Sequence, residues 1–261
     1  MRLKIYVANA FAGNQFGGNP AAVVPLETWL SDAQMQEIAA QNNLAETAFI
    51  VPQKDDFFIR WFTPAVEVAL CGHATLASAH IFFSQLAFAK DTIRFQSKSG
   101  LLEVTKKDNG QLTLNFPADP VVQTESLDLI EAGLGVKPRF VYKTAFDFMV
   151  VLDNQKQIES LSPDFNILRK LPSRGIIATA KGDQSDFVSR CFFPQSGIDE
   201  DPVTGSAHTA MVPYWAKQLG RTRLSAIQLS KRKGYLDCEL AGDRVLMSGN
   251  AFTYLVGEIF I

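Results

Sequence analysis

The chain has 261 residues, of which 47% are hydrophobic and 20% are charged, and its formal net charge is −2. This composition excludes a disordered protein, and the length allows one large domain or two halves that can each bury a core. Because 25 basic side chains face 27 acidic ones, the chain lacks the positive excess that binds phosphate backbones or anionic lipid. We therefore expect no nucleic acid and no membrane as a partner.

The cysteines and the N-terminus indicate the compartment. Cys71, Cys191 and Cys238 cannot all pair within the chain, which favours free thiols in a reducing environment. The first seven residues alternate like a strand and lack the apolar core of a signal peptide, and no apolar run reaches the ~18 residues of a membrane span. We expect a cytoplasmic protein.

The first half of the chain predicts short strands around one buried helix. Ser31 and Gln34 form a capping box that opens an amphipathic helix to about residue 41, with Met35 and Ile38 on its inner face. A second helix, residues 73–87, is apolar almost all round and must be wrapped by other elements. Apolar runs predict strands at 4–8, 21–24, 48–51, 57–62 and 111–116.

Pro117 and Pro120 mark the predicted domain boundary, because proline disfavours both helix and ladder pairing. We expect an N-terminal domain over residues 1–118, completed by residues 250–261, and a C-terminal domain over residues 119–249. The second half contains a core helix at 206–219, which Pro213 should kink. Its predicted strands are 141–146, 149–152, 176–180, 187–193, 226–230 and 244–247.

The two halves repeat each other. Residues 56–64 match residues 186–194 without a gap and share Asp, Phe, Arg, Phe and Pro, and downstream residues 72–75 correspond to residues 205–208. Both halves run strand, proline turn, glycine turn, helix. Strands that enclose one buried helix make a closed or nearly closed barrel. We therefore expect an α+β fold of two similar domains, each a β-barrel wrapped around a central helix, related by a pseudo-two-fold axis.

The starts of the two core helices are candidate anion sites. Each helix begins at a glycine, Gly72 or Gly205, where the first backbone N–H groups are unpaired and the helix dipole is positive. In an interdomain cleft these groups could hold a substrate carboxylate and the oxyanion that forms when a neighbouring C–H is deprotonated. The alternative is that both glycines only make tight turns.

Glu46 is a difference between the halves, because the second half has Ile176 at the corresponding position. A carboxylate among Leu44, Ala48 and Phe49 loses hydration, which favours its protonated form and suits a general acid or base. The alternative is a glutamate at a strand edge that points to water.

Three further polar residues lie near the helix starts. Asp201 precedes the second helix and is either a cleft group or a simple dipole partner. The helix dipole should keep His73 neutral as a hydrogen-bond partner, unless it is an exposed residue of the capping region. Ser206 either caps its helix, offers a hydroxyl to a ligand, or does both.

The sequence indicates no metal and no cofactor. His73, His80 and His208 lack metal-ligand spacing. The glycine-rich segment 13–20, which contains Asn19, has neither the P-loop nor the dinucleotide-binding order of glycines. We expect it to be a loop that borders the cleft.

Several segments together resemble the phenazine biosynthesis PhzF-like isomerase family, and the resemblance spans most of the chain. The segments are Gly18-Asn19-Pro20-Ala21-Ala22-Val23-Val24, Asn43-Leu44-Ala45-Glu46-Thr47-Ala48-Phe49, Arg60-Trp61-Phe62-Thr63-Pro64, Glu67, Cys71-Gly72-His73-Ala74-Thr75 and Asp201-Pro202-Val203-Thr204-Gly205-Ser206-Ala207-His208.

The resemblance implies the diaminopimelate epimerase fold, a homodimer, and a cofactor-independent isomerase acting on a small carboxylate-bearing substrate. It places Glu46 as the residue that shuttles the proton, with His73, Asp201 and Ser206 as further catalytic groups. The implied substrate-binding residues are Gly72, His73, Gly205, Ser206 and Asn19.

The related amino-acid epimerases use two cysteines, one before each helix start. Here Cys71 fills the first position, but our alignment puts Val203 at the second, so a two-thiol reaction lacks one proton carrier. A glutamate-only proton transfer fits better. The alternatives are an epimerase that uses Glu46 with Cys71, and a non-catalytic binding or scaffold protein that keeps the isomerase fold.

Overall fold

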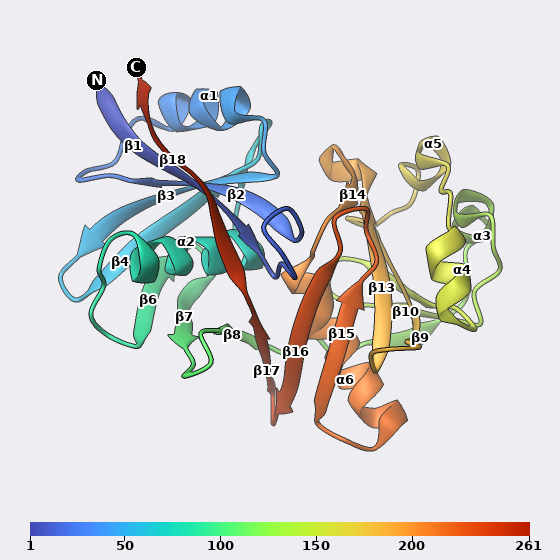
Figure 1. Ribbon diagram of the computed structural model, residues 1–261. Helices are drawn as coiled ribbons and strands as arrows, with labels where there is room; N and C mark the ends of the chain where they lie inside the picture. The colour runs from blue at the N-terminus through green and yellow to red at the C-terminus, as the bar shows by residue number, and fades with distance from the viewer. The chain divides into compact units, whose positions relative to one another are not determined.

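Eighteen strands and six α-helices build the protein, as a computed structural model of all 261 residues describes it (Figure 1). The chain divides into two compact units with a mixed α+β composition. Unit 1 comprises residues 1–115 and 248–261, and unit 2 comprises residues 116–247. No helix is both long enough and apolar enough to cross a lipid bilayer.

Unit 1 combines parallel and antiparallel pairs of strands. Strand β2 runs parallel to β3, and β3 runs antiparallel to β4. The last strand of the chain, β18, pairs antiparallel with β1. The elements are β1 (Arg2–Ala10), β2 (Asn19–Pro25), α1 (Asp32–Asn42), β3 (Glu46–Gln53), β4 (Asp56–Phe62), β5 (Glu67–Val68), α2 (Gly72–Ser84), β6 (Thr92–Ser97), β7 (Gly100–Lys106), β8 (Leu112–Pro117), which leads into unit 2, and β18 (Ala251–Phe260).

Unit 2 repeats this pairing order. Strand β11 runs parallel to β12, and β12 runs antiparallel to β13. The elements are β9 (Val122–Thr124), α3 (Asp128–Leu134), β10 (Phe140–Lys143), β11 (Phe148–Val151), α4 (Gln155–Ser160), α5 (Phe165–Leu168), β12 (Ile176–Lys181), β13 (Phe187–Phe193), a 3-10 turn (Pro194–Ser196), β14 (Ile198–Asp201), α6 (Gly205–Leu219), β15 (Arg223–Gln228), β16 (Gly234–Ala241) and β17 (Arg244–Gly249), which leads back into unit 1.

The repeat extends to individual ion pairs. In unit 1, Arg60 donates to both carboxylate oxygens of Glu67, at 2.7 and 2.8 Å. In unit 2, Arg190 makes the same two bonds to Glu200, at 2.7 and 2.9 Å. In each unit the ion pair joins a long strand, β4 or β13, to the short strand that follows it, β5 or β14. The short strand leads into the core helix, so both pairs fix the segment before a helix start.

The core helices are buried because their surfaces are apolar. Ten residues of α2 are buried, including the whole run from Gly72 to Ala79. In α6, Trp215 stacks on Phe187 with 6.0 Å between ring centroids, and its indole N–H donates to Thr179 at 2.9 Å. A helix that is apolar on all sides is stable only when other elements surround it.

The structure confirms the predicted capping box and corrects several boundaries. Ser31 and Gln34 cap α1 reciprocally. The strand predicted over 141–146 stops at Lys143, because the Thr144 hydroxyl accepts bonds from the next backbone N–H groups and turns the chain. Helix α6 continues through Pro213. Sequence reasoning missed β5, β6, β7, β9, β14, β16 and the helices α3, α4 and α5.

The Arg60–Glu67 pair yields a stability prediction. The hydrogen bonds from Arg60 outweigh burial and lower the pKa of Glu67 to about 2. We expect Glu67→Gln to lower the free energy of unfolding at pH 7 by about 1–3 kcal/mol, measured by urea denaturation. Since the folded-state pKa lies below the ordinary 4.5, this contribution is present above pH 4.5 and is lost as the pH falls towards 2.

The control for that prediction is Glu103→Gln. Glu103 binds the exposed Arg94 with one bond of 2.9 Å on the surface. A surface pair of this kind contributes at most about 0.5 kcal/mol. Equal losses in the two variants would contradict a special role for the Arg60–Glu67 pair.

Candidate active site

Strand topology brings Asn19 and Glu46 to the same edge in unit 1. Asn19 begins β2 and Glu46 begins β3, and these strands are parallel, with Ala21 opposite Glu46. Gly18, before Asn19, has φ +68°, and a Cβ there would lie 2.3 Å from the carbonyl oxygen of Ala10. The turn into β2 therefore requires glycine.

Helix α2 supplies the third residue of this cluster, His73, from its first turn. Its N-cap residue, Cys71, makes no side-chain capping bond, so no cap competes for the first N–H groups. Gly72 lacks a positive φ, as does Gly205 at the start of α6, so the tight-turn alternative does not explain these glycines. Both are buried at the first positions of their helices.

Glu46 and His73 meet in the interior of unit 1. The Oε2 atom of Glu46 lies 2.9 Å from Nε2 of His73, and the two residues are 8% and 4% exposed. The alternative of a glutamate pointing to water is therefore wrong. The two atoms are in charge contact but not aligned as a hydrogen bond, and each lacks a hydrogen-bond partner. Such unpaired buried atoms are unusual outside functional sites.

The charge state of His73 differs from the prediction. Burial lowers the pKa of the ring, but the neighbouring Cys71 and Glu46 side chains act in the opposite direction and prevail, so the pKa of His73 lies well above its ordinary value of 6.5. The expected neutral histidine is therefore corrected to one that favours the imidazolium, because a carboxylate lies closer to the ring than the helix dipole argument assumed.

Asn19 approaches the other ring nitrogen of His73. Its Nδ2 atom lies 3.1 Å from Nδ1. An amide can present either its nitrogen or its oxygen to a ring, so Asn19 can pair with a bare or a protonated Nδ1. The structure thus places this predicted substrate-binding residue against His73.

Cys71 is a neutral thiol in this cluster. Burial raises its pKa to about 11, and the charge of Glu46 adds to the effect. Its sulfur lies 3.6 Å from Nδ1 of His73, while Glu46 faces Nε2. The three side chains are close enough to suggest metal ligands, but Cys71 and Glu46 face opposite nitrogens of one ring. They cannot meet a single ion in tetrahedral geometry without rearrangement.

The start of α6 in unit 2 corresponds to the start of α2. Its N-cap is Thr204, as Cys71 is the N-cap of α2, so Thr204 is the counterpart of Cys71. The sequence alignment, which put Val203 at this position, was wrong by one residue. Ser206 does not cap the helix, because it is the second helical residue. Asp201 is buried and accepts a bond from the Thr204 hydroxyl at 2.6 Å. The structure thus places Gly205, Ser206 and Asp201 within one helix start.

Sequence reasoning missed two residues beside Ser206. Arg174 donates to the Ser206 hydroxyl at 3.1 Å and to Asp147 through Nε at 2.9 Å. Asp147 precedes β11 and Arg174 precedes β12, the two parallel strands of unit 2. The repeat could have indicated Arg174, because this residue lies two positions before Ile176, the counterpart of Glu46.

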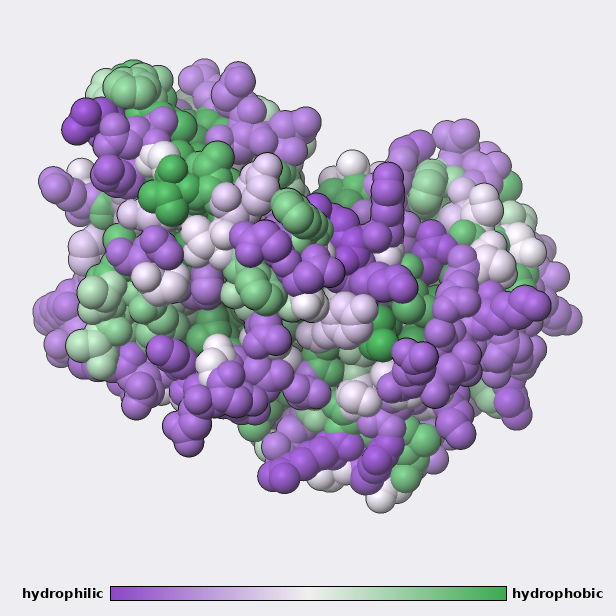
Figure 2. Space-filling model, in the orientation of Figure 1, coloured by the Kyte–Doolittle hydropathy of each residue, from purple (hydrophilic) through white to green (hydrophobic).

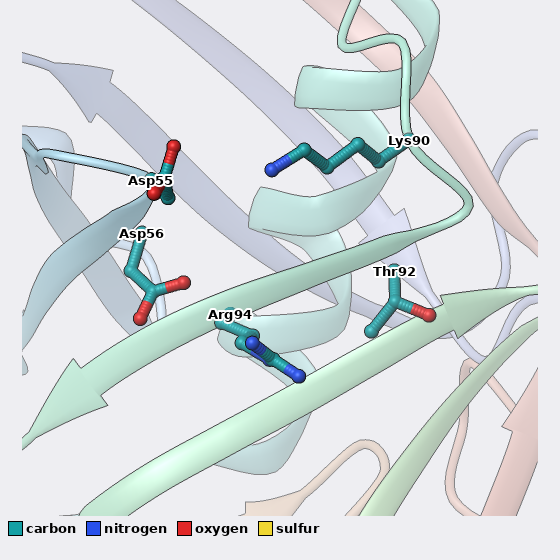
Figure 3. A pocket seen from close by; sticks show the side chains of 5 residues that line it. All are labelled: Asp55, Asp56, Lys90, Thr92 and Arg94. Carbon is teal, nitrogen blue, oxygen red and sulfur yellow. The ribbon is translucent and has the colours of Figure 1, made fainter.

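A separate hollow lies on the surface of unit 1 between the start of β4 and β6 (Figure 3). Figure 3 shows Asp55 and Asp56 on one side and Lys90 reaching towards them. Arg94 lines the hollow and is bonded to Glu103. None of the predicted site residues lines it, so it is not the candidate active site.

Comparisons with known proteins agree with the fold. A family model described as phenazine biosynthesis-like protein matches residues 8–257. An uncharacterized isomerase of Pseudomonas aeruginosa is 48% identical over 261 residues, covering 100% of both chains. The crystal structure of a PhzF-family phenazine biosynthesis protein from Enterococcus faecalis is 45% identical, with a TM-score of 0.96 over 100% of both chains.

A more distant structure is similar in fold alone. A hydroxyproline epimerase from Agrobacterium vitis is 10% identical and has a TM-score of 0.62, covering 99% of this chain and 92% of its own. The predicted α+β class is confirmed by these matches.

The three histidines provide a direct test of the site's electrostatics. Burial lowers the pKa of His80 and of His208 to about 4. We expect 15N-histidine NMR to show His73 protonated above pH 6.5 and the other two neutral down to about pH 4. Because the folded-state pKa of His208 lies below 6.5, the stability it contributes is present above pH 6.5 and is lost as the pH falls towards 4.

For His73 the sign is reversed. Its raised pKa contributes stability below pH 6.5, which is lost as the pH rises through the folded-state pKa. The control is Glu46→Gln, which removes the neighbouring carboxylate and should lower the pKa of His73 without moving that of His208. A wild-type His73 that titrates at or below 6.5 would contradict the assignment.

Proposed function

The chain belongs to the phenazine biosynthesis-like family, and we propose that it is an isomerase that moves a proton on a small carboxylate-bearing metabolite. Glu46 is the general acid and base of the reaction, and the proton transfer uses side chains and backbone amides of the chain without a cofactor. The observation that carries this proposal is the buried Glu46 carboxylate in charge contact with His73 at the start of α2.

Glu46 is suited to take a proton from carbon. Its Oε2 atom is buried, lies 2.9 Å from Nε2 of His73 and has no aligned hydrogen-bond partner. The Glu46 carboxylate removes a proton α or vinylogous to the substrate carboxylate, and the C–H electron pair moves into the conjugated system as an enolate. Glu46 then returns the same proton to another carbon, so the double bond moves and no atom is gained or lost.

Backbone amides stabilise the enolate in this scheme. The first N–H groups of α2, at Gly72 and His73, have no side-chain cap and stand at the positive end of the helix dipole. The start of α6 offers equivalent groups at Gly205 and Ser206. We propose these residues and Asn19 as substrate contacts, and Asp201 as a further group of the site, oriented by its bond from Thr204.

Two finer structural proposals accompany the function. We propose that each unit closes into a β-barrel around its core helix, because α2 is buried almost all round and packs against β1, β2, β3 and β18. We also propose a homodimer. Tyr254, Leu255 and Val256 of β18 are consecutive and exposed, so both faces of this strand present apolar side chains. Figure 2 shows apolar residues gathered on the surface of unit 1.

The two other functions are weaker. An epimerase that used Glu46 with Cys71 would need a thiolate as its second base, and the pKa of about 11 keeps Cys71 protonated at neutral pH. A scaffold protein would have no reason to leave Oε2 of Glu46 and Nε2 of His73 without aligned hydrogen bonds in its interior.

Glu46→Gln tests the proposed proton transfer. We expect the variant to fold and to bind the same small carboxylates as the wild type in a thermal-shift screen. Exchange of the bound compound's C–H hydrogens in deuterated water, followed by NMR, should fall by a factor of about 10² or more, because an amide cannot accept the proton. Unchanged exchange would refute the role of Glu46.

The matched control is Cys71→Ala, which removes a neighbouring side chain of the same cluster. The glutamate-only reaction predicts that exchange persists within about tenfold of the wild type. If the alanine variant lost exchange as completely as Glu46→Gln, the epimerase with two acid–base groups would be the correct reading.

The homodimer has its own test. We expect Val256→Lys to shift the protein from dimer to monomer in sedimentation velocity, because a charge on this apolar strand would have to be desolvated in the interface. Lys4→Ala, on the neighbouring strand, is the control and should leave the dimer intact. A monomeric wild type would overturn the proposal.

A further inference from the structure

We propose that Arg174 is a positioning residue that fixes the Ser206 hydroxyl as a hydrogen-bond donor to the carboxylate of the ligand. This inference rests on the proposed function, in which Ser206 contacts a carboxylate-bearing substrate. It starts from the geometry of three side chains in unit 2. One guanidinium group bridges Asp147 and Ser206, with Nη2 at 3.1 Å from the Ser206 oxygen.

The guanidinium group is held rigidly. Asp147 is 3% exposed and takes two bonds from Arg174, and its own backbone is fixed by the Thr144 hydroxyl. The backbone N–H of Arg174 donates to the carbonyl of Phe146 at 2.8 Å. The ring of Phe193 lies 5.0 Å from the guanidinium carbon. The position of Arg174 is therefore set before any ligand binds.

This contact determines which way the Ser206 hydroxyl points. A guanidinium group has only donors, so the Ser206 oxygen must accept, and the single hydroxyl proton is directed elsewhere. Serines within a helix commonly donate to the carbonyl four residues earlier, as Ser78 does to Ala74 and Ser84 to His80, both at 2.7 Å. Ser206 makes no such bond, and its proton has no acceptor in the structure.

The repeat supports a functional reading of this arrangement. Ser206 corresponds to His73, and Arg174 lies two residues before the counterpart of Glu46, near the amino ends of the equivalent strands. Unit 1 thus sets a carboxylate against the second residue of its core helix, whereas unit 2 sets a cation there. A cation and an oriented hydroxyl donor can together bind an anion. The Arg174 side chain is 37% exposed, so a ligand carboxylate can reach it.

The competing reading is that Arg174 only neutralises the buried Asp147. In that case its loss would lower stability but would act on ligand binding independently of Ser206. Removing the arginine alone leaves a buried, unpaired carboxylate. The test therefore uses Arg174→Lys, which keeps the positive charge beside Asp147 but cannot bond Asp147 and Ser206 with a planar fork.

The experiment is a double-mutant cycle on the full-length protein with benzoate as the probe, followed by 1H–15N NMR titration. We expect Arg174→Lys and Ser206→Ala each to weaken benzoate binding about tenfold, and the double variant to be no weaker than Ser206→Ala alone. Effects that multiply in the double variant, or an unchanged dissociation constant in Arg174→Lys, would overturn the proposal. So would a wild type that fails to bind benzoate at up to about 50 mM.

Two further variants separate positioning from folding. Arg221→Lys is the control, because Arg221 forms an ion pair with Asp186 in unit 2 and does not touch Ser206. It should leave benzoate binding unchanged. The double variant Asp147→Asn with Arg174→Met removes the buried charge together with the cation, and should bind benzoate as weakly as Ser206→Ala while remaining folded. If it bound benzoate like the wild type, Arg174 would have no positioning role.

Benzoate binding requires no proton transfer, so the two proposals fail separately. Persistent C–H exchange in Glu46→Gln would refute the proposed chemistry and leave the benzoate cycle standing. A benzoate cycle without coupling would refute the role of Arg174 and leave the exchange result standing.

Discussion

A carboxylate removed from water needs a positive partner, and the candidate site depends on this constraint. Glu46 is buried at the first residue of β3, and the group that faces it is the imidazole of His73. The pair is close enough for charge attraction but is not aligned as a hydrogen bond. Their remaining hydrogen-bonding capacity is thus available to a third group. A site that fully satisfied Glu46 would be more stable and would have less to offer a substrate.

Both units use the same arrangement of two parallel strands and a core helix. Two parallel strands begin at one edge, and the core helix begins beside them, so three residues far apart in sequence come together. In unit 1 the arrangement assembles Asn19, Glu46 and His73, and in unit 2 it assembles Asp147, Arg174 and Ser206. The backbone arrangement is repeated while the charges are not, which fits the proposed reaction at one end of a carboxylate-bearing substrate.

The arginine–glutamate pairs explain why the helix starts are well placed. Arg60 with Glu67, and Arg190 with Glu200, join the strand before each core helix to the short strand that leads into it. These bidentate bonds restrict the approach of the chain to the helix. The pairs therefore limit movement of the first turns of α2 and α6, which supports the proposed role of their backbone N–H groups.

The sequence by itself determined the repeat, the two apolar core helices and the capping box of α1, because these follow from apolar periodicity and from matched segments of one chain, and it singled out Glu46 as a candidate. It missed short strands such as β5 and β14, which tertiary pairing stabilises and which have no apolar period of their own. Only the tertiary structure showed that Glu46 meets His73 and that Arg174 meets Ser206. Contacts between residues 27 or 32 positions apart depend on how parallel strands and a helix start are packed, and the charge state of His73 depends in turn on those contacts.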